Sequence, residues 1–144
     1  MDPTNAVVKL CAQGMEEEGR GNGAEATTLF AQAWTQSTND FERCIAAHYL
    51  ARHQATAELS LHWNQEALDC ANRVADASVA EFFPSLYLNL GKSHEDLEND
   101  DEARRLYECA AAKLASVPAG AYRDIVQDGI NRGLLRVRNS RRLD

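Results

Sequence analysis

The stretch from Leu86 to Ala110, LYLNLGKSHEDLENDDEARRLYECA, places the strongest constraint on how this chain folds. Apolar, aromatic and small residues recur at helical spacing on both sides of the turn sequence Asn99-Asp100-Asp101. Gly91 before the turn and Ala103 after it are small enough to let two helix backbones approach closely, whereas Tyr107 fills the remaining space. The stretch therefore predicts two helices folded back on each other.

The same pattern of small and aromatic residues occurs near the start of the chain. Gly14 precedes Ala26 by twelve residues, as Gly91 precedes Ala103, and Phe30 then stands where Tyr107 stands in the later stretch. Such an internal repeat resembles the tetratricopeptide repeat, a helix-turn-helix unit of about 34 residues that stacks on copies of itself. We see the resemblance over roughly residues 6–117, and it is weakest in the middle, where alignment needs an insertion.

The resemblance implies an all-α fold of about seven helices, arranged as a right-handed solenoid of three helical hairpins plus a C-terminal capping helix. We expect a single domain over residues 1–144. Its expected parts are hairpin 1 at 4–36, a degenerate hairpin 2 at 39–77, hairpin 3 at 83–117, a capping helix at 119–138 and a basic tail at 139–144.

Helix starts are indicated by three Asn-x-x-Glu sequences, which begin at Asn22, Asn39 and Asn99. In this arrangement the Asn side chain accepts from free backbone N–H groups while the Glu reaches back. We therefore expect all three Asn residues to cap helices. The third helix should run from about 40 to 54, and the fourth from 57 to about 77.

Charge and composition restrict the function classes. The chain is 44% hydrophobic and 26% charged, with a net charge of −7, which is typical of a globular protein. Residues 1–118 hold 9 basic and 19 acidic side chains, so the body is acidic and disfavours nucleic acid. Residues 119–144 hold 6 basic and 3 acidic side chains, which suit a solubilising helix end.

No run of residues approaches the length of a membrane span, and the N-terminus lacks the profile of a secretory signal. We therefore expect a cytoplasmic protein with no membrane association. The four cysteines, none in a CxxC pair, are expected to be reduced and to lie on apolar helix faces: Cys11, Cys44, Cys70 and Cys109. Paired acids such as Glu16-Glu17-Glu18 and the run from Glu95 to Glu102 are expected to be solvated.

In tetratricopeptide proteins, the first helix of each pair lines a concave groove that usually receives a peptide. The resemblance therefore implies a noncatalytic adaptor that binds a protein or peptide, with an anionic, carboxylate-bearing ligand among the candidates. The expected groove residues are His48, Tyr49, Arg52, Asn89 and Lys92, with His53, Trp63 and Asn64 as additional candidates. The alternative is that Tyr49 and Trp63 pack between hairpins while His48 and Arg52 are solvated.

Other functions have weaker sequence support. A small-molecule or weakly catalytic site centred on His48 and His53 is the second hypothesis, with a carboxylate across the groove as partner. Cys44 and His48 lie four residues apart, but one helix supplies only two ligands, so we expect no metal and no cofactor. A homodimer could form through the C-terminal helix, where Leu134, Leu135 and Val137 are apolar.

Overall fold

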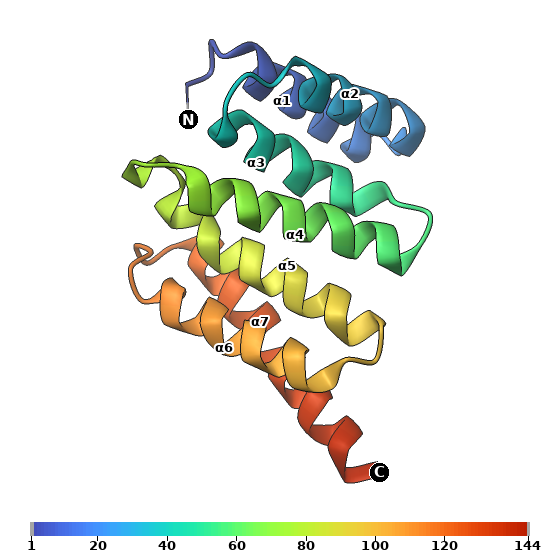
Figure 1. Cartoon of the computed structure of the whole chain (residues 1–144), viewed down its shortest axis with the longest axis vertical. Helices are drawn as coiled ribbons and strands as arrows, with labels where there is room; N and C mark the ends of the chain where they lie inside the picture. Colours follow the sequence, from blue (N-terminus) through green and yellow to red (C-terminus); the bar gives the residue numbers. More distant parts are fainter. Residues whose placement is uncertain (1, 144) are drawn as a thin grey trace. The chain divides into compact units, whose positions relative to one another are not determined.

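The computed structural model describes residues 2–143, and side chains up to residue 139. Within these residues the protein is all-α, with seven α-helices and no strand, which confirms the expected class and helix number (Figure 1). The helices are α1 Ala6–Gly19, α2 Gly23–Gln36, α3 Asp40–Leu50, α4 Ala57–Arg73, α5 Phe83–Asp96, α6 Asp100–Leu114 and α7 Ala121–Leu143. Two 3-10 turns, Ala51–His53 and Ala77–Phe82, follow α3 and precede α5.

The described chain forms two compact units, one up to Ser78 and one from Val79 on. In the first unit, α1 packs on α2 and α3 on α4, and α3 also contacts both α1 and α2. In the second unit, α5 packs on α6, and α7 contacts both of them. Consecutive helices α1–α2, α3–α4 and α5–α6 run antiparallel (Figure 1). The expectation that the whole chain is one domain stays a prediction.

The repeated glycines are where aromatic rings enter between paired helices. A Cβ placed on Gly14 would lie 2.3 Å from Cε1 of Phe30, and one on Gly91 would lie 2.9 Å from Cδ1 of Tyr107. Both rings are fully buried. Gly133 of α7 also contacts Tyr107, since a Cβ there would lie 2.5 Å from its Cζ. The predicted close approach at Gly14 and Gly91 is therefore confirmed, and the aromatic ring is what fills it.

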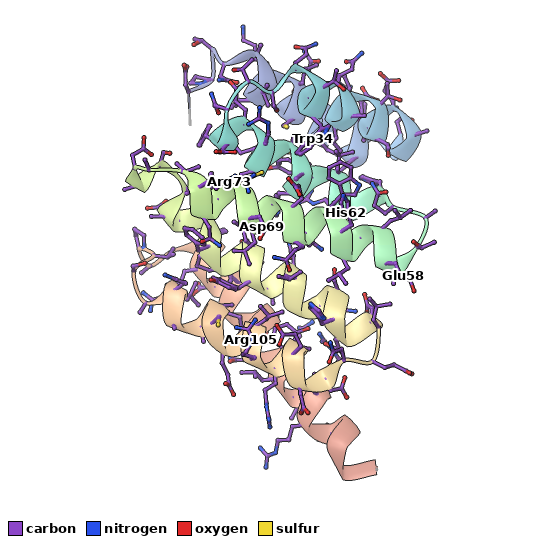
Figure 2. The ribbon with its side chains drawn as sticks, viewed as in Figure 1. Trp34, Glu58, His62, Asp69, Arg73 and Arg105 are labelled. Carbon is purple, nitrogen blue, oxygen red and sulfur yellow. The ribbon has the colours of Figure 1, made fainter. Side chains whose placement is uncertain are left out.

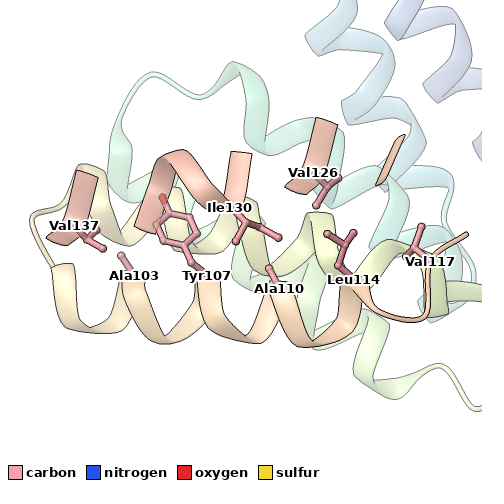
Figure 3. Close-up of a cluster of buried hydrophobic side chains, with 8 residues drawn as sticks. All are labelled: Ala103, Tyr107, Ala110, Leu114, Val117, Val126, Ile130 and Val137. Atoms are coloured by element: carbon pink, nitrogen blue, oxygen red, sulfur yellow. The ribbon is translucent and has the colours of Figure 1, made fainter. Parts of the chain in front are cut away.

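The core of the second unit lies between α6 and α7 (Figure 3). Tyr107 and Ile130 are completely buried there, and Val137 is 2% exposed. The full set of buried apolar side chains is Ala103, Tyr107, Ala110, Leu114, Val117, Val126, Ile130 and Val137. Burial of this apolar stripe is what holds α7 against the preceding hairpin.

Only one of the three predicted Asn caps forms. The side chain of Asn39 accepts from the backbone N–H of Glu42 at 2.8 Å. Asn22 and Asn99 stand directly before α2 and α6, so the predicted helix starts are confirmed, but their side chains form no cap hydrogen bond and that part of the prediction is wrong. Asn22 instead donates to Glu17 at 2.7 Å, and the Asn99 side chain lies 3.2 Å from Nδ1 of His94. A competing side-chain partner in the preceding turn therefore replaces each cap.

Two caps that the Asn-x-x-Glu pattern did not include begin α1 and α4. Asn5 accepts from the N–H groups of Val7 and Val8, at 2.8 and 3.0 Å. The hydroxyl of Thr56 accepts from the N–H of Leu59 at 3.1 Å. Both residues are of the types that favour helix N-caps.

Three helix ends differ from their predicted positions. Helix α3 ends at Leu50, before the predicted residue 54, and is followed by the 3-10 turn Ala51–His53. Helix α4 ends at Arg73, before the predicted residue 77, because Asp76 accepts from the N–H of Ser78 at 2.9 Å and stabilises a turn there. At the other end of the chain, residues 139–143, predicted as a basic tail, continue α7. The backbone of that segment is helical rather than extended.

Candidate binding site

The carboxylate of Glu18, in the last turn of α1, joins two residues from the turn that follows α3. Its Oε1 accepts from Nη1 of Arg52 at 3.0 Å, and its Oε2 lies 2.6 Å from Nε2 of His53. The side chain of Glu18 is 20% exposed. The expectation that this acidic run is solvated is therefore wrong for Glu18, because the turn after α3 brings a cation and an imidazole to it.

An aromatic stack lies behind this carboxylate. The ring of Tyr49 is stacked on buried Phe30 with centroids 5.2 Å apart, and the ring of His53 lies 6.0 Å from Phe30. The guanidinium of Arg52 lies 4.8 Å from the centroid of Tyr49, and His48 meets the same ring edge-on at 5.0 Å. The structure thus brings together four of the predicted residues, His48, Tyr49, Arg52 and His53, around Phe30 and Glu18.

Burial decides the protonation of this cluster. Burial and, to a lesser extent, the nearby Arg52 together lower the pKa of His48 to about 4, while Glu18 opposes the change. His48 is therefore neutral near pH 7 and offers a neutral N–H rather than a positive charge. Burial also raises the pKa of Tyr49, so its hydroxyl stays protonated. Arg52 carries the exposed cationic surface of the cluster, with a side chain that is 45% exposed.

The predicted residues of the second unit lie on α5. Lys92 is 51% exposed and forms an ion pair with Asp96 one turn later on the same helix. Asn89 is half-buried. Near it on α5, the hydroxyl of Ser85 lies 2.7 Å from that of Tyr122 on α7. That Asn89 and Lys92 share one groove with Arg52 stays a prediction, because the two units are described separately.

Trp63 and Asn64 lie on α4, where Trp63 is half-buried and Asn64 is buried. The ring of Trp63 meets Trp34 of α2 edge-on, with centroids 4.9 Å apart and an interplanar angle of 79°. Asn64 is buried at 7% exposure. The alternative reading, in which Trp63 and Tyr49 pack between helices, therefore fits both contacts. Trp34 was not among the predicted site residues.

A second carboxylate arrangement in the other unit was also missed. Glu95 accepts from the hydroxyl of Tyr107 at 2.6 Å and from Nε and Nη2 of Arg136 at 2.7 and 3.1 Å. Burial would raise the pKa of Glu95, but the hydrogen bonds from Arg136 and Tyr107 outweigh burial and lower it. Glu18 and Glu95 each follow a repeat glycine by four residues, which is the sequence signal that could have identified both.

The remaining predictions on cysteines, metals and membranes have simple outcomes. All four cysteines are free; Cys11, Cys44 and Cys70 are buried as expected, whereas Cys109 is half-buried. Burial raises the pKa of Cys11 and Cys44 to about 12, which leaves these thiols protonated. In the part of the chain that the structure describes, no cluster of His, Cys, Asp or Glu has the make-up of a metal site, and no helix could cross a membrane.

The apolar residues expected at a dimer contact differ in how far they are buried. Val137 is 2% exposed and belongs to the core, whereas Leu134 is partly buried against the same cluster. Leu135 is 56% exposed. A homodimer through α7 therefore stays a prediction, with Leu135 as the most exposed of the three residues.

Comparison with known proteins adds no family assignment. No protein-family model matches the chain, and neither curated proteins nor solved structures give a match. The arrangement defines an all-α protein with a cluster of aromatic and charged side chains from α1, α2, α3 and the turn that follows α3.

Proposed function

We propose that this protein is a noncatalytic, tetratricopeptide-like helical repeat that binds a peptide segment of another protein. The observation that carries the proposal is a packing unit that occurs twice. In each unit an aromatic ring enters at a glycine of the preceding helix, Phe30 at Gly14 and Tyr107 at Gly91. Repetition of this kind is the property of modules whose helices build a surface rather than a closed pocket.

The repeated packing arrangement also includes a glutamate carboxylate in each copy. Glu18 binds Arg52, 34 positions later, and Glu95 binds Arg136, 41 positions later. The second separation is longer because residues 115–120 join α6 to α7, whereas residues 37–39 join α2 to α3, and because Arg136 lies further from the start of its helix. In both units the carboxylate ties a hairpin to the helix that follows it. These equivalences support a solenoid-like arrangement, with α7 as the cap.

The surface of α1 and α3 is the part that best suits a ligand. The guanidinium of Arg52 lies over the ring of Tyr49 and is held by Glu18, so little conformational entropy is lost when it contacts a partner. Met15, 45% exposed, offers a flexible apolar contact on α1. An arginine beside an aromatic ring is typical of residues that dominate binding energy. We include Asn89 and Lys92 of α5 as further contacts, and a reducing, cytoplasmic setting suits the free cysteines.

The proposal is tested by affinity capture from a lysate, read by mass spectrometry. The double variant Arg52→Ala/Lys92→Ala removes two exposed cations from the proposed surface. Its matched control is Arg73→Ala/Arg132→Ala, which removes the same charge from exposed positions on α4 and α7. We expect a protein captured by the wild type and the control but lost from the first double variant. Capture that is equal for both double variants would contradict the assigned surface.

A second measurement addresses the chemistry of the partner. Peptides derived from the captured protein are compared with a free and with an amidated C-terminus. A preference for the free carboxylate supports charge-assisted recognition by Arg52. The contact of Glu18 with His53 is the one observation that favours the alternative of a small-molecule site. A small molecule that co-purifies in native mass spectra, with no captured protein, would replace the peptide proposal by that alternative.

A further inference from the structure

Where Trp34 of α2 meets Trp63 of α4, a second aromatic surface forms. It includes Trp63, one of the predicted groove residues, but none of the side chains clustered around Glu18. We define the tryptophan patch as Trp34, Leu59, His62 and Trp63. The two indoles are half-buried and meet edge to face, Leu59 is 46% exposed, and His62 is exposed beside Trp63. Figure 2 shows Trp34 reaching from α2 toward α4, on the side of α4 where His62 lies.

Acidic side chains surround this patch. Glu58, His62 and Asp69 recur on one side of α4, which Figure 2 shows facing the same way, and Glu66 follows Trp63 by three residues. Among the described residues, none of these three acids forms an ion pair. Each arginine in the first unit is instead paired with a carboxylate of α1 or α3: Arg20 with Glu17, Arg43 and Arg73 with Asp40, and Arg52 with Glu18.

The charge of the unit reinforces this local imbalance. Residues 1–78 contain 5 basic and 11 acidic side chains. A positively charged partner therefore gains from the general field as well as from local contacts. Indole is the aromatic group that attracts a cation most strongly, which favours an arginine or lysine as the group that meets the tryptophans.

We propose that the tryptophan patch binds a basic segment of a partner protein. An arginine or lysine of that segment lies against an indole, an apolar side chain contacts Leu59, and further cations approach Glu58, Glu66 and Asp69. This interaction is independent of the peptide site on α1 and α3. It would give the module two faces, of which this one selects for positive charge.

Intrinsic fluorescence gives a direct assay, because Trp34 and Trp63 are the only tryptophans in the chain. The probe is an acetylated peptide of alternating leucine and arginine, added to the full-length protein. Its control is the same peptide with citrulline, a neutral analogue of similar shape, in place of arginine. We expect the arginine peptide to change the emission and to bind at least tenfold more tightly than the citrulline peptide.

Variants separate the patch from general charge attraction. Glu58→Gln should weaken the arginine peptide about threefold, whereas Glu16→Gln, the same change at an exposed position on α1, should have less than a twofold effect. Trp63→Phe keeps an aromatic ring but attracts a cation more weakly, so it should lower the affinity for the arginine peptide about threefold. This affinity is measured by fluorescence anisotropy of a labelled peptide. Its thermal melt reports whether the fold is intact.

Three results would overturn the proposal. The first is equal affinity for the arginine and citrulline peptides. The second is an equal loss of binding in Glu58→Gln and Glu16→Gln, since that outcome indicates attraction by net charge alone. The third is concentration-dependent self-association, in sedimentation experiments, that is abolished by Trp63→Phe, because the patch would then be a contact between copies of this chain.

Discussion

The substitution Gly14→Ala tests the packing on which both units depend. Alanine is the best helix former, so replacing a glycine within α1 gains about 1 kcal/mol if nothing obstructs the new methyl group. At Gly14 the methyl carbon would lie 2.3 Å from Cε1 of Phe30 and 2.8 Å from two further ring atoms. These distances lie well inside ordinary carbon contact, so the ring or the helix must move.

The destabilisation by Gly14→Ala depends on how far the ring of Phe30 can move. Phe30 is fully buried, and Tyr49 and His53 are stacked on it. Overpacking in such a core typically costs about 1–3 kcal/mol, and we take the upper end because the clash involves three ring atoms. After the gain in helix propensity, we expect Gly14→Ala to lower the free energy of unfolding by about 2 kcal/mol.

Gly19→Ala is the matched control, because it lies in the same helix and a Cβ there meets nothing within 4 Å. Gly19→Ala should leave the free energy of unfolding unchanged or raise it by up to about 0.5 kcal/mol. The gain is small because Gly19 is the last residue of α1, where helix propensity counts less than in the helix interior. Urea denaturation followed by tryptophan fluorescence monitors the first unit, which contains both tryptophans. The reasoning is refuted if Gly14→Ala is as stable as Gly19→Ala.

A double-mutant cycle makes the test specific to the ring. Phe30→Ala alone should cost about 3–5 kcal/mol, because it empties the site that the ring fills. In the Phe30→Ala background the methyl group at residue 14 meets open space, so Gly14→Ala should no longer destabilise. A coupling energy near zero between residues 14 and 30 would show that the cost arises elsewhere.

Three further predictions concern charge and hydrogen bonds. The pKa of His48 in the folded state, about 4, lies below its ordinary value of 6.5. At a pH between these two values, the unfolded state binds a proton that the folded state does not. Stability should therefore fall by about 1–2 kcal/mol from pH 7 to about pH 5 in urea denaturation, and His48→Gln should flatten this fall. Asn39→Ala should cost about 1 kcal/mol by removing a cap, whereas Asn22→Ala should cost clearly less, as thermal melts would show. Tyr107→Phe should cost about 1–2 kcal/mol by removing the hydrogen bond to Glu95, a loss that guanidinium denaturation would measure.

Much of the fold follows from residue spacing. The recurrence of Gly14, Ala26 and Phe30 at Gly91, Ala103 and Tyr107 identifies where paired helices meet, and the structure has these contacts. Helix order and number are predictable because turn residues and apolar stripes alternate regularly. Helix ends are less predictable, since a cap depends on which partner the Asn side chain finds first. Asn22 and Asn99 find side chains in the preceding turn, which a local pattern does not specify.

The candidate site was predicted as residue types rather than as an arrangement. His48, Tyr49, Arg52 and His53 were selected because they cluster along one segment, and the structure does place them together. Glu18, the partner of Arg52 and His53, lies more than thirty residues before them and resembles part of a solvated acidic run when the local sequence alone is considered. Burial also makes His48 neutral, which spacing alone does not reveal because it depends on tertiary packing.

The two carboxylates show how a repeat can be concealed. Glu18 and Glu95 occupy equivalent places after their glycines, and each binds an arginine of the next helical element. The connections to those arginines differ in length, so a fixed repeat period aligns the glutamates but not the arginines. The two units share the contact between glutamate and arginine but differ in the number of residues that separate them in the sequence. The charge pair joins each hairpin to the helical element that follows it. Among the described residues, only the paired arginine of the first unit also lies over a tyrosine ring, and we therefore place the peptide site there.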